Sequence, residues 1–155
     1  MKEVEEELYK SLRDDDDPND GIPALLGNTS TAPYNVYHSH LPESVDFRQD
    51  DDHSFITYFL VSSIGDQDQH DRSGTTLEQL YQFTVWSRYL SKMHDIHARI
   101  KLRLNRKWKV SDPTENAVIH QVRFEADGPE TWDDDFKVFT KPATYRVWVR
   151  DDNIG

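Results

Sequence analysis

Seven histidines are the residues of this sequence best suited to metal binding or acid–base chemistry. His38 and His40 are two positions apart, so both imidazoles would lie on one side of an extended strand. His94 and His97 are three positions apart, which makes them neighbours on a helix. A hydrolytic metal site needs a further ligand, and Asp95 is the only carboxylate adjacent in sequence to either pair. Neither spacing matches the HExxH pattern of metalloproteases, so solvated histidines are the favoured interpretation and a small metal-dependent enzyme is the alternative.

The sequence shows no motif of the common catalytic classes. It has no cysteine, which excludes disulfides, thiolate metal sites and a cysteine nucleophile. It lacks a glycine-rich phosphate loop and the GxSxG elbow of serine hydrolases. Aspartate runs at 14–17, 50–52 and 133–135 have carboxylates suited to calcium, but none has the regular spacing with glycine of an EF-hand loop. We expect solvated acidic loops there, with no metal or cofactor.

Composition predicts one acidic domain with a compact core. The chain has 155 residues, of which 35% are hydrophobic and 30% charged, and this balance favours a real core with long solvated loops. A net charge of −11 argues against affinity for DNA or for anionic membranes, because both would be repelled. No apolar run is long enough to span a membrane, and the N-terminus MKEVEEELYK is too acidic for a signal peptide. We therefore expect a soluble protein made in the cytoplasm.

One stretch, residues 77–105, is expected to organise the rest of the chain. Its first part alternates apolar and polar residues with the period of two that is typical of a strand with one buried face. From residue 90 the apolar residues recur at three- and four-residue steps, which predicts an amphipathic helix with Ser91 as a candidate N-cap. The buried residues that these two patterns predict are Tyr81, Phe83, Val85, Met93, Ile96, Ile100 and Leu104.

Shorter patterns complete a single domain. Val4, Leu8 and Leu12 are four positions apart and predict an N-terminal helix with one apolar stripe. With the strand patterns, this predicts an α+β fold: an antiparallel sheet of four to five strands with two helices packed on one face and long acidic loops. The expected parts are residues 1–35 for the first helix and a linker, 36–150 for the sheet and main helix, and 151–155 for a tail.

The strand patterns also predict a second face of the sheet. If the alternating apolar residues point at the helices, their sequence neighbours point away from them. Trp and Arg are enriched in interface hot spots, so this outer face is a candidate subunit-contact surface. Scattered amphipathic side chains on a solvated sheet are the other interpretation. The residues expected on the outer face are Trp86, Ile119, Arg123, Arg146 and Trp148.

Two regions of the sequence resemble a known family. The segment YNVYHSHLPESVDF, followed by a strand and by LEQLYQFTVWSRYLSKMHDIHARIKLRLN, is similar to the core of the siphophage tail completion proteins, also called tail terminators. In that family a strand ending in Trp-Ser leads directly into a helix. The segment FEADGPETWDDDFKVFTKPATYRVWVR resembles the family's last hairpin, in which a Gly-Pro and acidic loop precedes an aromatic strand. The resemblance covers residues 34–150.

This resemblance implies a structural virion protein without enzymatic activity. Members of the family form a ring, typically of six copies, at the head-proximal end of a long tail, where they stop polymerisation of the tail tube and join the tail to the neck. The implied partners are identical copies, the tail tube protein and the connector or stopper protein, while DNA passes through the channel without specific binding. A head-completion or stopper component of the connector is the alternative function.

Residue roles in such a ring follow from the expected faces and loops. The outer face of the sheet would bury its Trp and Arg side chains between subunits. The acidic loops at 65–74 and 128–135 would reach axial neighbours or line the channel, where carboxylates prevent phosphate contacts. The predicted interface residues are Trp86, Arg123, Arg146 and Trp148, and the predicted axial or channel-facing residues are Asp66, Asp68, Asp71, Glu130, Asp133, Asp134 and Asp135.

Overall fold

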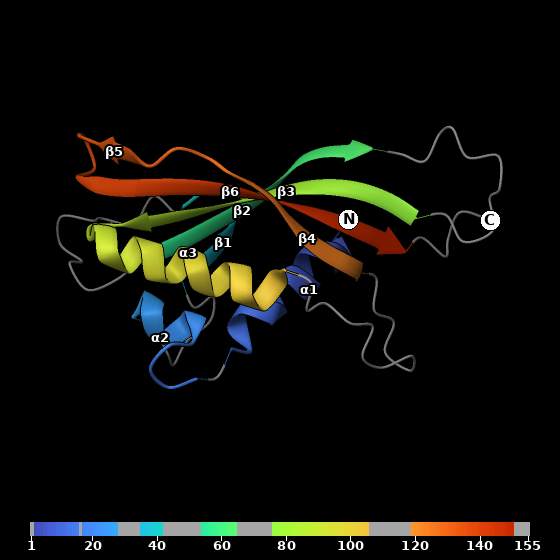
Figure 1. Ribbon diagram of the computed structural model, residues 1–155, viewed down its shortest axis with the longest axis horizontal. Coiled ribbons are helices and arrows are strands. Elements are labelled where there is room, and N and C mark those ends of the chain that lie inside the picture. Colours follow the sequence, from blue (N-terminus) through green and yellow to red (C-terminus); the bar gives the residue numbers. More distant parts are fainter. Residues whose placement is uncertain are drawn as a thin grey trace.

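Three helices lie together on one side of a long, twisted sheet (Figure 1). The computed structural model describes residues 2–15, 17–27, 35–41, 54–64, 76–105 and 119–150. In these ranges no helix is long and apolar enough to cross a membrane. The elements in chain order are α1 (Lys2–Arg13), α2 (Ile22–Leu26), β1 (Val36–His38), β2 (Phe55–Ile64), β3 (Thr76–Ser87), α3 (Leu90–Leu104), β4 (Ile119–Asp127), β5 (Thr131–Asp133) and β6 (Val138–Arg150).

The sheet has six strands in the order β1-β2-β3-β6-β4, and the short β5 pairs with β6 beside β4. The predicted α+β fold is confirmed, but the sheet is larger than the predicted four to five strands and is covered by three helices. It is also mixed, because β1 runs parallel to β2 while all other pairs are antiparallel. The chain between His38 and Phe55 is long enough for the crossover connection that a parallel pair needs.

The apolar residues of the strands and helices meet in one main core, as the alternation and helical periodicity predict. At its centre aromatic rings pack across neighbouring strands, with ring centroids 5.4 Å apart for Tyr58 and Phe83 and 5.5 Å apart for Phe83 and Tyr145. Such rings bury about 150–250 Å² each and dominate the energy of a core. The core includes Tyr81, Phe83, Val85, Tyr145, Val147 and Val149 from the sheet, Met93, Ile96, Ile100 and Leu104 from α3, and Val4, Leu8 and Leu12 from α1.

Ile119 belongs to this core and not to the outer face, so its predicted position is wrong. Its Cα is paired with that of Val149, and its side chain is fully buried on the helix side of the sheet. A β-bulge lies between Ile119 and Gln121, and a second lies between Phe124 and Ala126. Because an extra residue in one strand reverses the alternation beyond it, simple counting placed Ile119 on the opposite face.

The turn from β3 into α3 differs from the predicted capping by Ser91. The helix begins at Leu90, and Tyr89 is the N-cap without a side-chain hydrogen bond, so Ser91 lies inside the first turn. Ser87 provides the acceptor instead, because its Oγ receives the Tyr89 N–H group at 3.2 Å. The same hydroxyl accepts a 2.9 Å hydrogen bond from the Ser54 hydroxyl. The buried serines Ser54 and Ser87 thus fix the start of α3. The N-cap predicted from the sequence, Ser91, lies inside the helix instead.

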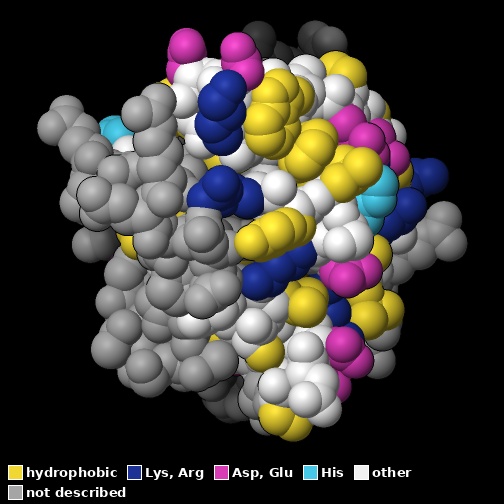
Figure 2. Space-filling view, turned by 90° about the vertical axis from the view of Figure 1, so that its left-hand side faces the viewer, with side chains coloured by type: hydrophobic (Ala, Val, Ile, Leu, Met, Phe, Trp, Pro, Cys, Tyr) yellow, Lys and Arg dark blue, Asp and Glu magenta, His cyan; other side chains and the backbone are white. Residues whose placement is uncertain are grey.

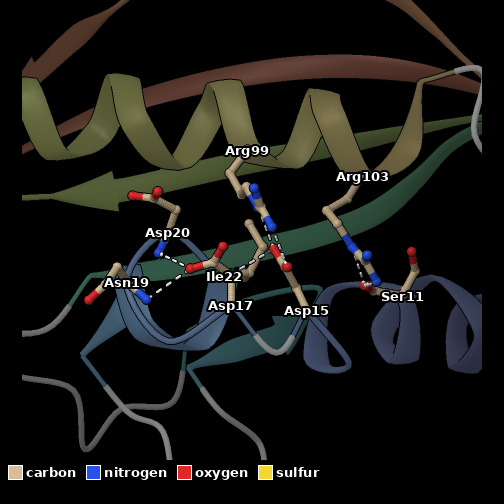
Figure 3. A network of polar contacts seen from close by, with 8 residues as sticks. All are labelled: Ser11, Asp15, Asp17, Asn19, Asp20, Ile22, Arg99 and Arg103. Carbon is tan, nitrogen blue, oxygen red and sulfur yellow. Dashed lines mark hydrogen bonds and ion pairs between the residues drawn. The ribbon is translucent and has the colours of Figure 1, made fainter.

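The connection from α1 to α2 is clamped onto α3 by a buried ion pair (Figure 3). Arg99 donates from Nε and Nη2 to the two carboxylate oxygens of Asp15, each at 2.6 Å. The Ile22 N–H group donates to Asp15 Oδ2 at 3.0 Å, and Asp15 itself is 3% exposed. Burial alone would raise the pKa of the Asp15 carboxyl, but the hydrogen bonds from Arg99 and Ile22 outweigh it and hold that pKa below its usual value.

Neighbouring polar contacts complete the clamp. Asp17 Oδ1 accepts the N–H groups of Asn19 and Asp20, both at 2.9 Å, which closes the turn before α2. One turn further along α3, Arg103 Nη2 donates to the carbonyl oxygen of Ser11 at the end of α1 at 2.8 Å. Two arginines of one helix therefore hold both N-terminal helices over the sheet. The helix layer is fixed in place and leaves the opposite face of the sheet uncovered by α1, α2 and α3 (Figure 1).

Candidate subunit-contact surface

The uncovered face of the sheet carries Trp148, Arg146 and Arg123, three of the residues predicted to lie on it, close together. Trp148 and Arg146 are two positions apart on β6, and the Cα of Arg146 is paired with that of Arg123 on β4. Their sequence neighbours Val147 and Val149 are fully buried against the helices, so the three side chains emerge on the outer side. The alternation correctly predicts the face on which these three residues lie.

Hydrogen bonds arrange this cluster around two carboxylates. Arg146 donates from Nη1 to Glu78 Oε2 at 2.7 Å and from Nη2 to Glu125 Oε1 at 2.9 Å. The Trp148 indole Nε1 donates to the other oxygen of Glu78 at 3.1 Å. The hydrogen bond from Arg146 lowers the pKa of Glu125, and hydrogen bonds to Glu125 and Glu78 raise the pKa of Arg146. The guanidinium and the indole are therefore held in fixed orientations, with the guanidinium charge already neutralised.

Arg123 differs from Arg146 in having no such partner. Its side chain is exposed, and among the residues that the structure describes it makes no hydrogen bond and no ion pair. Its charge acts only at longer range, where it helps to lower the pKa of Glu125. In a chain of net charge −11, an exposed cation on an uncovered sheet face is a ready site for a carboxylate from another molecule.

Trp86 also lies on the outer face but far from this cluster. It is paired with Thr140, eight residues along β6 from Trp148, which corresponds to roughly 26 Å at the rise of a strand. Its indole Nε1 donates to Thr57 Oγ1 at 3.0 Å, and the ring packs against a small second core of Phe55 and Val138. The four predicted interface residues thus fall in two places, and Trp86 has a packing role within its own chain.

The predicted acidic loop residues are only partly within the described ranges. Asp66, Asp68 and Asp71 lie outside them. Asp133 Oδ1 accepts the N–H groups of Asp135 and Phe136, each at 3.0 Å, and so shapes the turn between β5 and β6. The remaining two acidic residues are paired within the chain: Asp134 Oδ1 with Lys137 Nζ at 2.7 Å, and Glu130 Oε1 with His94 Nε2 at 2.5 Å and Lys141 Nζ at 3.5 Å.

Three of the histidines that the structure describes, His38, His94 and His97, are paired with carboxylates of other elements. His38 Nε2 lies 2.9 Å from Glu5 Oε1, and His97 Nε2 lies 2.7 Å from Asp127 Oδ1. Burial, together with the charges of Lys141 and Lys101, lowers the pKa of His97 even though Asp127 raises it. His40 is exposed. Over the described ranges, no three histidine, aspartate or glutamate side chains are arranged to hold a metal ion.

Sequence reasoning missed the partners of these polar residues because they are distant in sequence. Arg99 and Asp15 are 84 positions apart, and His94 and Glu130 are 36 positions apart. Arg99 lies on the polar stripe of α3, where a solvent-facing side chain is the usual expectation. The run of aspartates followed by Gly21 was the one available signal, since a glycine there indicates a tight approach of the backbone.

The comparisons with known proteins concern the fold. No model of a known protein family matches the sequence, and no curated protein matches it. Among solved structures, the fold is similar to that of a chain in the virion of a native gene transfer agent (GTA) particle, with a TM-score of 0.61. The sequences are 14% identical, and the alignment covers 93% of this chain and 92% of that chain. The two chains therefore share one fold over nearly their whole lengths.

Proposed function

We propose that this protein is a structural component of a phage-like virion and acts as a tail terminator. In this role, copies of the chain, typically six, form a ring at the head-proximal end of the tail, end the polymerisation of the tail tube and join the tail to the neck. The observation that carries the proposal is the fold shared with a chain of a virion particle, since the alignment spans almost all of both chains. The passage from β3 directly into α3 and the final hairpin are also the features on which the resemblance of the sequence to the tail terminators rests.

The uncovered sheet face supports a ring. A ring closes when one surface of each copy binds a different surface of the next copy. Here Trp148 and Arg123 form one such surface, with an indole held by Glu78 and a guanidinium without an ion pair in the described part of the chain. Charged and aromatic residues of these types are enriched where subunits meet. In the ring, a carboxylate of the neighbouring copy would neutralise Arg123.

Electron microscopy of the particles tests the proposed position. We expect a ring of this protein where the tail joins the head, and tails of uncontrolled length in particles that lack it. A ring seen only inside the head connector would instead support the head-completion or stopper function. The absence of any ring at the head-proximal end of the tail contradicts the proposal. Purified protein that stays monomeric does not contradict the proposal, because the ring can close only once the copies bind to the tube.

Substitutions on the sheet face test the subunit contact. Arg123→Glu should prevent ring closure by placing like charges together, while the unfolding of the monomer stays nearly unchanged because the side chain is exposed. Lys10→Glu, at an exposed cation on α1, is the matched control. Trp148→Ala should likewise weaken assembly and lower monomer stability by about 1 kcal/mol, against about 3–5 kcal/mol for a truncated core tryptophan. Normal rings from Arg123→Glu would exclude this face as the contact.

A further inference from the structure

The two edges of the sheet differ in how far their backbone groups are occupied. On β4, at one edge, the Ile119 N–H group donates to Glu7 Oε2 of α1 at 2.9 Å. The Phe124 N–H group of the same strand donates to Asn105 Oδ1 at 2.9 Å, just after α3. Side chains of the protein itself therefore occupy part of the β4 edge, which hinders the addition of a strand from another molecule.

The opposite edge is open along the second half of β2. There β1 pairs with β2 only from Ile56 to Tyr58, whereas β2 continues to Ile64. Within the described part of the chain, no strand lies beside residues 59–64 on that side. This stretch, which we call the open edge, contains neither a charged residue nor a proline, the residues that usually discourage pairing with a further strand.

Exposed apolar side chains accompany the open edge. Leu60 and Val61 are 38% and 49% exposed. A β-bulge lies between Leu60 and Ser62, which increases the local twist, so only a short strand can pair here. The end of the molecule that carries β5 and the start of α3 also exposes hydrophobic side chains, but these lie among Lys, Arg, Asp and Glu side chains (Figure 2). The open edge differs in combining exposed apolar groups with an unpaired, uncharged strand.

A hollow of about 460 Å³ lies where β1 ends and the open edge begins. Its walls are formed by Glu5 of α1, His38 and Ser39 at the end of β1, and Phe59 and Leu60 of β2. One wall is therefore polar and the other apolar. The volume is sufficient for a long side chain, since it falls within the range of small-molecule sites.

The hollow opens on the helix side of the sheet. The Cα of Leu60 is paired with that of Tyr81, which is fully buried beneath the helices, so both side chains lie on that side. A strand added to β2 would point every second side chain in the same direction. One side chain of such a strand would therefore reach the hollow.

The polar wall of the hollow carries a negative charge. His38 Nε2 lies 2.9 Å from Glu5 Oε1, and His38 Nδ1 lies 3.1 Å from Ser39 Oγ. A neutral imidazole satisfies both contacts by donating to Glu5 and accepting from Ser39, so the carboxylate stays charged. Burial, and next the charge of Glu5, raises the pKa of the Tyr58 hydroxyl, as expected of a negative potential. The Glu5 side chain is 26% exposed and remains accessible.

The side chain that complements this hollow is a long cation. Lysine and arginine have an apolar stem that can lie on Phe59 and Leu60 and a charged head that can reach Glu5. An acidic segment would be repelled by Glu5. The same edge of a second copy would leave the hollow without a cation, because residues 59–64 contain no basic residue.

We infer that the open edge binds an extended segment of another polypeptide, which adds a strand to the sheet and places a lysine or arginine side chain in the adjoining hollow. Hydrogen bonds between the two main chains provide affinity in this mode of binding, and the hollow provides selectivity for sequence. The site goes beyond the proposed function and is separate from the proposed ring contact, because Arg123 lies on the strand at the other edge of the sheet.

Selection from a peptide library tests the site. The folded protein selects from randomised hexapeptides with blocked ends, and the most enriched peptide is titrated into isotope-labelled protein. We expect lysine or arginine at one position, apolar or β-branched residues at its alternate neighbours, and the largest amide shifts at residues 59–63. Enrichment without a basic residue, shifts centred on β4, or affinity no better than millimolar would each overturn the inference.

Variants of the protein and of the peptide separate charge from main-chain pairing. Glu5→Gln, and norleucine in place of the basic residue of the peptide, should each weaken binding about tenfold, and together no more than either alone. Glu6→Gln, at the exposed neighbour on α1, is the control and should change affinity less than about threefold. Thermal unfolding confirms that both variants are folded. Equal affinities of Glu5→Gln and the unchanged protein contradict the assigned role of the hollow.

N-methylation of the peptide tests the main-chain pairing without changing the protein. Methyl groups on alternate amides should abolish binding in one of the two possible phases, where they face β2, and be tolerated in the other. Equal binding of both methylated peptides would show that no strand is added to the sheet.

A single thiol tests whether the open edge pairs with itself. The chain has no cysteine, so Ser63→Cys introduces one thiol at an exposed position of the open edge. Under mild oxidation it should form no more disulfide-linked dimer than the control Gln121→Cys, at an exposed position of β4. Efficient dimer formation by Ser63→Cys alone would assign the edge to a second copy and overturn the inference.

Discussion

Two aspartate-rich segments of this protein look alike in sequence and behave differently in the structure. In the first, between α1 and α2, Asp15 is 3% exposed and bound by Arg99 of a distant helix. In the second, between β5 and β6, Asp134 has an 83% exposed side chain and pairs with Lys137 three residues away. The difference comes from what lies opposite each segment. A carboxylate becomes part of the tertiary structure only when another element brings a cation and donors to it.

The first segment joins the two N-terminal helices to α3, whereas the second shapes only its own turn. Removing one partner of a buried ion pair leaves the other charge uncompensated, which is costly. An exposed pair between near neighbours contributes little, because water screens it. The contrast between the two segments can therefore be tested by matched substitutions, which should give effects of very different size.

The largest effect is expected at the buried ion pair. Asp15→Asn keeps an acceptor for the Ile22 N–H group but leaves the Arg99 guanidinium, whose side chain is 21% exposed, without its counter-charge. We expect a loss of about 3 kcal/mol in the free energy of unfolding, measured by chemical denaturation. Asp14→Asn, at the exposed neighbour, is the control and should change stability by less than about 0.5 kcal/mol. Equal effects at both positions would contradict the role assigned to the buried pair.

A smaller effect is expected at Gly21, which precedes α2. Its backbone is ordinary, with φ of −64°, so only space restricts the residue there. A Cβ atom would lie 2.5 Å from the carbonyl oxygens of both Asp15 and Asp17. Gly21→Ala must therefore distort the turn that holds Asp15 and Asp17 and should cost about 2 kcal/mol by denaturation, within the range for overpacking. An unchanged stability would show that the turn can shift without cost. The ion pair with Arg99, and not the tight backbone packing at Gly21, would then hold this segment on α3.

Acidification should remove the contribution of the buried pair. The pKa of Asp15 is lower in the folded protein than its usual value of 3.8, so the stabilisation is complete above that value and is lost as pH falls toward the lowered pKa. The stability difference between the unchanged protein and Asp15→Asn should consequently shrink below about pH 4. Denaturation curves from pH 6 to pH 2 measure it. A difference that stays constant over this range would exclude ionisation of Asp15 as its source.

The sequence predicts those parts of the fold that depend on local periodicity. The alternation in β3 and the spacing in α3 identify the correct buried residues, because each element buries one face and repeats its pattern along that face. The same reasoning places Trp148, Arg146 and Arg123 together on the outer side. It fails for Ile119, where a β-bulge changes the alternation, since nothing local marks the extra residue.

Contacts between distant elements are the part that the sequence does not predict. The parallel pairing of β1 with β2 depends on where the chain returns after a long connection. The ion pair of Asp15 and Arg99 joins residues 84 positions apart, and a run of aspartates alone predicts a solvated loop. The separation of Trp86 from Trp148 along one face is a further example, because alternation identifies a face but not a cluster on it.

The smallest effects are expected in the second aspartate segment. Asp133→Ala removes the acceptor of two backbone N–H groups in the turn before β6 and should cost about 1 kcal/mol, since water partly replaces those hydrogen bonds. Asp134→Asn removes the charge that pairs with Lys137 but keeps an oxygen for the side-chain hydrogen bond with Trp132, and it should leave the midpoint of denaturation unchanged within error. Because Asp133 shapes the turn that presents Phe136, its variant should also broaden the amide signals of residues 133–137 in NMR spectra, whereas Asp134→Asn should not. A larger loss of stability at Asp134 than at Asp133 would reverse this order and show that the exposed charge, and not the backbone turn, holds the hairpin end.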